Sequence, residues 1–432
     1  MKSYFFVLFY FLIAQLSFSQ EQYLPIDTAN FPIRKTKSAE YLERTKLFKK
    51  EINEKYAGKE KSYISDCFDT MHKNFNKELL AGDYVFDARF DSMVEEVVAE
   101  LKAKNPEIPN DLTFYISKEP ALNAASMGDR CFVVNMGTFY FLDNEMQLAA
   151  IISHEMGHLL LNSVIKSMQR ENVLNQTDSK QQLKNIRKLK TNKNEEAFKS
   201  YKNLLYSESN IRQAEEYRAD SVGYTLYRNT KYAKDNYLSA MELIAQYDTV
   251  KPIGLSIEIY KKTFDLPNQP FKDEWLKRED FSTYDYTKYK ARIDADSVRS
   301  HPETTERIAA LKKIFPELSA QSADSTKASE KFKELNKIAQ MEQMPNFDYS
   351  EDYGIGIYLC LLHIQNNDYV DYYKSWLGKF FQKIYTARKN YTLNRYLDRI
   401  APNNQSESYQ QFLNFMWNLN LNEIKNIADY FQ

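Results

Sequence analysis

Cysteine and glycine are both scarce in this sequence. Its 432 residues include only 10 glycines and three cysteines, Cys67, Cys131 and Cys360. Three cysteines allow one disulfide at most, and no Cys-x-x-Cys pair is present. A disulfide framework and a thiolate metal site are therefore excluded. Few glycines and long charged stretches favour a helix-rich protein that is stabilised by a hydrophobic core.

An excess of basic charge is also missing. The chain has 58 Lys and Arg against 59 Asp and Glu, which gives a formal net charge of −1. General binding of nucleic acid needs a basic excess that neutralises phosphates, so this class of function is excluded. The apolar share of 43% and the charged share of 27% are ordinary for a globular protein. The length is sufficient for a catalytic domain and an accessory domain.

Beyond the N-terminus, no stretch is apolar enough over a sufficient length to predict a membrane helix. The N-terminus itself has a basic Lys2, an apolar run over residues 4–14, and the small residues Ser17 and Ser19. This pattern is typical of a signal peptide over residues 1–19 that is cleaved after Ser19. An uncleaved anchor is the alternative. We therefore expect an exported, periplasmic or secreted protein without a membrane span in its mature chain.

The first half of the sequence changes its hydrophobic period twice. Helical spacing of apolar residues predicts helices over 38–56, 63–80 and 90–104, and short β-prone runs predict strands over 112–116, 121–127 and 131–135. A strongly apolar helix should follow Asn144, which is a suitable N-cap with Gln147 at the capping-box position. The sequence thus predicts a small sheet just before a buried helix.

The second half is mostly helical and polar. Residues 170–210 are lysine-rich and are interpreted as a solvated insertion. Helices are expected over 211–227 and 304–315, followed by a linker over 319–331 and by aromatic helices without a clean repeat period. We therefore expect a first domain over 20–316, and a linker with a helical C-terminal domain over 317–432.

One segment carries a metal-binding pattern. His154-Glu155-Met156-Gly157-His158 fits His-Glu-x-x-His, and the sequence has only five histidines, so an accidental match is improbable. Positions i and i+4 share one helix face, so both imidazoles can bind one zinc ion. Glu155 lies beside them, where a carboxylate can accept a proton from water.

A catalytic zinc site usually has three protein ligands and one open position. Leu161 and Val164 occupy the places where an extended motif would have its glycine and its third histidine, so the third ligand must lie elsewhere. Glu216 is the best candidate, and Asp220 follows four residues later on the same helix face. Asp220 can then bind the outer nitrogen of a ligand histidine. An ordinary exposed acidic pair is the alternative.

Together these motifs resemble metallopeptidase family forty-eight, which includes the HtpX-like proteases, the CAAX prenyl proteases and soluble periplasmic relatives. The resemblance covers about residues 112–315. It includes Asn123-Ala124 with the valine-rich strand that ends in Asn-x-Gly, and His301-Pro302 followed by Arg307-Ile308.

The resemblance implies a zincin-type domain, mainly α with a small β-sheet (α+β), followed by the helical C-terminal region. It implies zinc as cofactor and Arg307 near the ligands. We expect the strand over 121–127, which includes Asn123 and Ala124, or its neighbour, to pair with an extended substrate. The resemblance also places His301 near the metal, where it would stabilise the oxyanion or occupy the open position and keep the enzyme latent. A buried capping histidine is the alternative.

Two departures from the family pattern narrow the expected function. His158 and Glu216 are 216 − 158 = 58 residues apart, with the charged insertion between them, and the membrane helices of the prenyl proteases are missing. We expect a zinc endopeptidase of the soluble exported branch, which acts on proteins or peptides and serves protein quality control in the cell envelope. The alternative is a latent or vestigial protease that works as a chaperone or assembly factor and binds a protein through its C-terminal helices. The intact Glu155 disfavours this alternative, because a site that only binds metal does not need a base. A third possible function is that of another zinc hydrolase or a lyase.

Overall fold

The computed structural model describes residues 23–26, 30–173, 193–249, 254–278, 302–319, 327–401 and 405–432. The expected signal peptide and residues 174–192 of the expected insertion lie outside the described residues. Contacts divide the chain into a larger unit, Asp27–Lys251 with Asp280–Gln343, and a smaller unit, Met1–Ile26 with Pro252–Glu279 and Met344–Gln432. The smaller unit therefore draws on separate stretches of the chain.

The larger unit begins with a helical hairpin and a third helix, as the apolar spacing predicts. These elements are α2 (Phe31–Lys55), α3 (Gly58–Ala81) and α4 (Ala88–Lys104). Gly82 has φ 99° and ends α3 in the left-handed conformation that favours glycine. The apolar faces of α2 and α3 pack together, and Tyr41 and Phe75 extend this core to the sheet.

A four-stranded mixed sheet follows, in the order β1-β2-β4-β3. Its strands are β1 (Tyr84–Val85), β2 (Thr113–Ser117), β3 (Ala124–Ser126) and β4 (Cys131–Asn135). β2 and β4 are parallel, while β1 and β3 run antiparallel to their neighbours. The predicted mainly helical fold with a small sheet is confirmed, and β3 is an edge strand among the described residues.

The buried helix predicted after Asn144 is α6 (Glu145–Leu160), which follows the short α5 (Met136–Phe141). The Asn144 side chain accepts hydrogen bonds from the backbone N–H groups of Met146 and Gln147, which caps the helix. The expected capping box is wrong in one detail. Gln147 accepts the N–H of Asp143, at 2.7 Å, and not that of Asn144.

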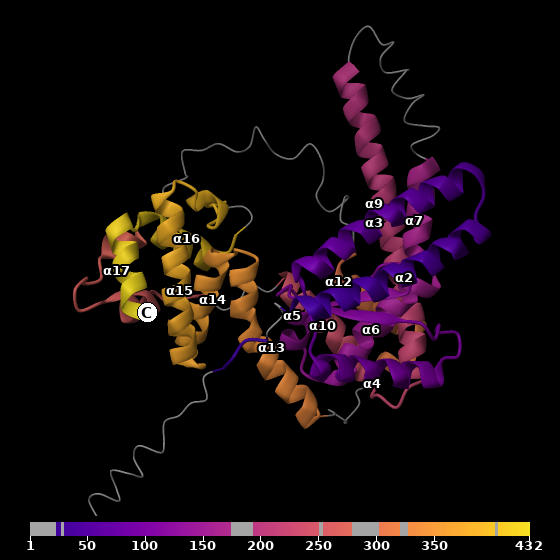
Figure 1. The fold of residues 1–432 in the computed structure, drawn as a ribbon, viewed down its shortest axis with the longest axis horizontal. Coiled ribbons are helices and arrows are strands. Elements are labelled where there is room, and N and C mark those ends of the chain that lie inside the picture. Colours follow the sequence, from indigo (N-terminus) through magenta and orange to yellow (C-terminus); the bar gives the residue numbers. More distant parts are fainter. Residues whose placement is uncertain are drawn as a thin grey trace, which may run out of the picture. The chain divides into compact units, whose positions relative to one another are not determined.

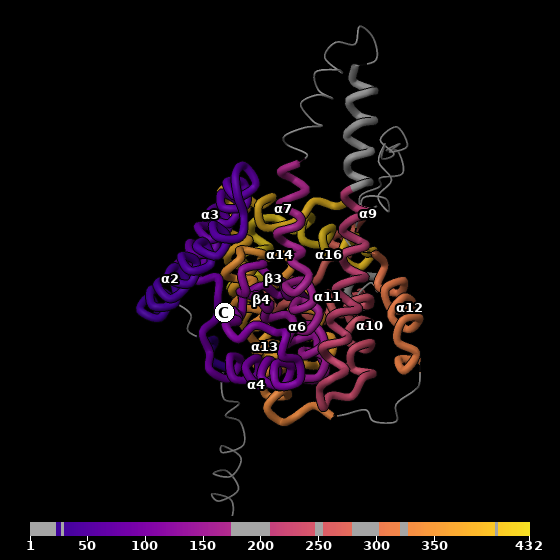
Figure 2. The backbone as a smooth tube through the Cα atoms, turned by 90° about the vertical axis from the view of Figure 1, so that its right-hand side faces the viewer, coloured from indigo at the N-terminus to yellow at the C-terminus, as the bar shows by residue number. Residues whose placement is uncertain are grey.

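Helices on several sides bury α6. α4, α9 (Lys193–Arg228) and α10 (Asp235–Thr249) all pack against it, and α6, α9 and α10 lie side by side in Figure 2. α12 (Thr304–Ile314) packs against α9 and α10. Because α6 is apolar on most sides, its polar residues can lie only where a neighbouring helix supplies polar partners.

Glycine permits an unusually close crossing of α6 and α9. A Cβ atom built on Gly157 would lie 2.7 Å from the carbonyl oxygen of Ala219, and one built on Gly223 would lie 2.8 Å from the Cα of His154. Real side chains do not tolerate such distances. The crossing therefore depends on these two glycines, and it brings the backbone of α9 against the middle of α6.

An ion pair joins the two helices that flank the expected insertion. α7 (Ser163–Val173) enters the insertion and α9 leaves it. Arg170 on α7 donates two hydrogen bonds to the carboxylate of Glu215 on α9, at 2.6 and 3.0 Å. Figure 1 shows α9 as a long helix with α7 beside it.

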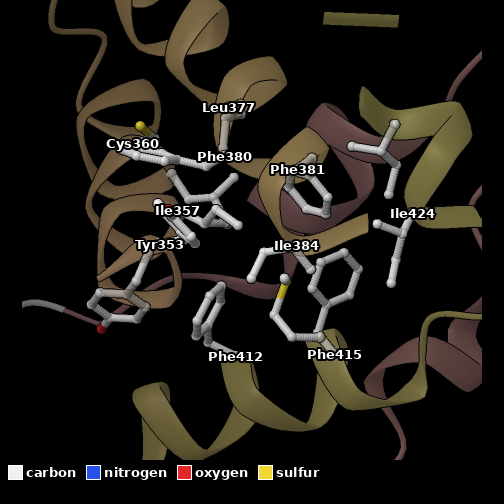
Figure 3. Close-up of a cluster of buried hydrophobic side chains, with 14 of the residues drawn as sticks. Tyr353, Ile357, Cys360, Leu377, Phe380, Phe381, Ile384, Phe412, Phe415 and Ile424 are labelled. Atoms are coloured by element: carbon white, nitrogen blue, oxygen red, sulfur yellow. The ribbon is translucent and has the colours of Figure 1, made fainter. Parts of the chain in front are cut away.

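The smaller unit is a helical bundle with an aromatic core, as the sequence predicts. It contains α11 (Ile257–Phe264), α14 (Tyr353–Gln365), α15 (Val370–Lys389), α16 (Glu407–Asn418) and α17 (Leu421–Phe431). α13 (Glu330–Tyr349) contains the division between the units. Figure 3 shows Phe380, Phe381, Phe412 and Phe415 gathered in this core.

No single helix in the described ranges is both long and apolar enough to cross a membrane. α6 and α7 meet the criteria of length and composition only as a pair, with a bend of 44° between them. All three cysteines are free thiols.

Candidate metal centre

The middle of α6 places His154 and His158 on one face, one turn apart. Their Nε2 atoms are 3.2 Å from each other, and the two rings meet edge to face. Both side chains are 16% exposed. The i, i+4 spacing of the motif therefore brings the two imidazoles to one point, as the sequence predicts.

Glu216 reaches the same point from α9. Its Oε2 atom is 3.5 Å from His154 Nε2, and its Oε1 atom is 3.3 Å from His158 Nε2. Among the described residues these three form a group whose ligand atoms all lie within 4.8 Å of one another. The close crossing at Gly157 and Gly223 explains how a residue 58 positions further along the chain arrives there.

The donor set fits zinc. Zinc with nitrogen and oxygen ligands at about 2.0–2.1 Å in a tetrahedron has neighbouring ligand atoms about 3.3 Å apart. The two Nε2 atoms are 3.2 Å apart, and each faces a different oxygen of the Glu216 carboxylate, at 3.3 Å from His158 and 3.5 Å from His154. Three lone-pair donors that converge at such distances repel one another unless a cation or a proton lies between them.

Asp220 and Arg307 hold the outer side of His154. Asp220 Oδ1 lies 3.0 Å from His154 Nδ1, and Arg307 donates two hydrogen bonds to the Asp220 carboxylate, at 2.6 and 2.8 Å. Asp220 is 1% exposed and Arg307 is 9% exposed. When the ring is neutral, a buried carboxylate in this position favours the proton on Nδ1, so that Nε2 faces the site with its lone pair.

This network is charged. Burial alone would raise the pKa of Asp220, but the Arg307 guanidinium and the His154 ring outweigh burial and lower it. Burial alone would lower the pKa of His154, but Asp220 and Glu216 outweigh it and, without a metal, raise the pKa to about 10. Arg307 opposes this rise and also lies 3.5 Å from Glu216 Oε2, but the two carboxylates together favour a positive charge on the His154 ring.

Sequence reasoning missed the partner of His158. Its Nδ1 atom lies 3.2 Å from the hydroxyl of Ser163, the first residue of α7. The only signal in the sequence is a serine five positions after the motif, where the helix breaks. Tyr237 was also missed: its hydroxyl donates to the backbone carbonyl of Asp220, at 3.1 Å.

Glu155 is anchored at one oxygen by the edge strand. The backbone N–H of Ser126 donates to Glu155 Oε2, at 2.8 Å. The other oxygen, Oε1, lies 4.0 Å from His154 Nε2, on the side of the ligand atoms. The structure thus leaves Oε1 as the atom that faces the site.

Around these residues lies a cleft of about 650 Å³. It is lined by the candidate ligands, Glu155, Asp220 and Arg307, and by the expected substrate strand at Asn123 and Ala124. The backbone N–H of Asn123 donates to the Thr138 hydroxyl, and its carbonyl accepts the N–H of Asn135. His301 lies outside the described residues.

Two histidines and a glutamate on crossing helices, with a second glutamate beside them and a strand edge along the cleft, define the class of site that metallopeptidases use. The family model of peptidase family M48 matches residues 86–315, more than half of the chain. The chain belongs to this family, which confirms the resemblance noted in the sequence and points to a metallopeptidase. No curated protein matches the chain.

Proposed function

We propose that this protein is a zinc-dependent endopeptidase. The observation that carries the proposal is the convergence of His154, His158 and Glu216 at the spacing of zinc ligands, with Glu155 Oε1 directed to the same point. Bound zinc would supply Lewis acidity, which makes water more acidic and a peptide carbonyl more electrophilic. Membership of family M48 supports the same reaction class.

In this mechanism Glu155 moves the proton. Ser126 N–H fixes Oε2, so that Oε1 accepts a proton from the attacking water and later gives it to the leaving amine. His154 and His158 hold their tautomers through Asp220 and Ser163. Each chemical role is thus assigned to a side chain whose position is fixed by a second group.

The substrate would lie along the edge of β3. The N–H of Asn135 donates to the carbonyl of Asn123, and the N–H of Met127 donates to the carbonyl of Cys131. These residues therefore form hydrogen-bonded pairs between β3 and β4. Pairing alternates in an antiparallel ladder, so Ala124 directs its N–H and C=O away from β4. An extended peptide can therefore add to this edge at Ala124.

We also propose that the protein acts outside the cytoplasm, in quality control of envelope proteins. The N-terminal sequence, with Lys2, the apolar run and Ser19, supports export. Intact mass of exported protein tests this proposal, because the mature chain should begin at Gln20. A mass that includes residues 4–14 would contradict it.

The test of activity is Glu155→Gln in the mature chain. Glu155 is not a ligand in this scheme, so the variant should retain about one zinc per chain and lose cleavage of an unfolded protein substrate. Glu95→Gln, an exposed glutamate on α4, is the matched control and should behave as wild type. Equal turnover in Glu155→Gln and wild type would reject the mechanism. A wild type that binds zinc without cleaving any substrate would favour a chaperone or assembly role.

A further inference from the structure

One wall of the cleft has no charged side chain. It is formed by Ala150 and Ile151 on α6, one turn before His154, and by residues of α10, which packs against α6. The α10 residues of this wall are Tyr237, Ala240, Met241 and Ile244. We call these six residues the apolar wall. The hydroxyl of Tyr237 already donates to Asp220, so the wall offers little for a polar group to bind.

The edge strand, by contrast, offers a peptide little main-chain binding. β3 is three residues long, and only Ala124 and Ser126 direct their backbone groups away from β4. The N–H of Ser126 is already bound to Glu155. A peptide on this edge therefore has few hydrogen bonds to gain, and binding must depend strongly on a side chain.

Charged groups of the cleft are engaged with one another. Arg307 binds Asp220, and Glu216 faces both histidines. A charged substrate side chain against the apolar wall would lose its hydration and find no partner there, whereas an apolar one would bury its surface.

We propose that the apolar wall receives an aliphatic or aromatic side chain next to the scissile bond, so that the preferred substrates are extended, apolar segments such as unfolded proteins expose. This inference rests on the proposed endopeptidase function. It adds the substrate class and names the residues of α10 that select it.

The test uses peptides that differ at one position beside the scissile bond, with Leu, Phe, Ala or Glu there. One extra methylene in an apolar pocket changes kcat/KM by roughly tenfold or more, so Leu and Phe should exceed Glu by at least that factor. The position at which the preference appears is read from the cleavage products by mass spectrometry.

Ile244 is the residue to change, because it is only partly buried and a variant should fold. Ile244→Lys places a cation on the wall, so cleavage of the Leu peptide should fall about tenfold or more and cleavage of the Glu peptide should rise. Gln246→Lys adds the same charge to the same helix at an exposed position outside the cleft, and it should leave the preference unchanged.

A second measurement separates the two proposals. Zinc-loaded Glu155→Gln should bind the Leu and Phe peptides more tightly than the Glu peptide, by about tenfold, even if no cleavage is ever observed. Cleavage or binding without this preference, or equal effects of Ile244→Lys and Gln246→Lys, would overturn the role of the apolar wall and leave the endopeptidase proposal intact. Absence of cleavage together with the binding preference would reject only the endopeptidase function.

Discussion

Gly157→Ala tests whether the close crossing of α6 and α9 sets the metal centre. In an isolated helix this change stabilises by about 1 kcal/mol, because alanine has the higher helix propensity. Here the new Cβ would lie 2.7 Å from the Ala219 carbonyl oxygen, whereas ordinary contact begins at 3.4 Å. The helices must therefore separate by about 3.4 − 2.7 = 0.7 Å at this point.

A shift of this size is large for a metal site. Distances between zinc and its ligands are maintained to within about 0.2 Å, so Glu216 could no longer complete the set without distortion. Overpacking of a helix interface costs about 1–3 kcal/mol. If this cost destabilises only the zinc-bound form, zinc affinity falls by roughly 5- to 150-fold. Competition with a chromogenic chelator measures the dissociation constant directly.

Gly378→Ala is the matched control. Its Cβ would also lie 2.7 Å from a backbone carbonyl, that of Phe431, but in the smaller unit. This variant should lose stability in thermal unfolding and keep wild-type zinc affinity. If Gly157→Ala binds zinc within about twofold of wild type, the crossing does not set the ligand geometry and the reasoning is refuted.

Three further predictions concern Ser163, the proton on His154 and the residue His301. Ser163→Ala should weaken zinc binding by about 10- to 100-fold, because His158 loses the hydroxyl that orients its ring. An unchanged zinc affinity would show that Ser163 has no role in the site. Zinc binding at pH 8 should release about one proton, because Asp220 and Glu216 raise the pKa of His154 to about 10. Calorimetry in two buffers of different ionisation enthalpy measures the number of protons released. Zinc binding without proton release would contradict the charged network. His301→Ala should retain zinc and lower turnover about a hundredfold if the histidine donates to the oxyanion. A rise in turnover would instead indicate a latent enzyme, and wild-type turnover would remove His301 from the site.

Local patterns predicted most elements of the larger unit. The strand at residues 131–135 and the N-cap at Asn144 depend only on residues that are close in the sequence, so local patterns predict them. His154, Glu155 and His158 lie within a single helical turn and a half, so their convergence needs no tertiary information. Glu216 was found because a third ligand was required and because Asp220 follows it at helical spacing.

Other features depend on contacts between distant segments. Nothing local indicates that Ser126 N–H binds Glu155, or that Gly157 and Gly223 permit a close helix crossing, because each requires knowledge of which elements are neighbours. The participation of Pro252–Glu279 in the smaller unit is of the same kind. Periodicity shows which face of a helix is apolar, but it does not show which partner covers that face.

The pairing of Arg170 with Glu215 has a consequence for chain connectivity. The two histidines precede residues 174–192 in the sequence, and Glu216 follows them. The ion pair between Arg170 and Glu215 joins α7 to α9. The close crossing joins α6 to α9. The contacts that bring the ligands together therefore lie outside residues 174–192. Two fragments of this protein, separated within that segment, contain the complementary halves of one metal centre, and the metal would act as a cross-link that joins them.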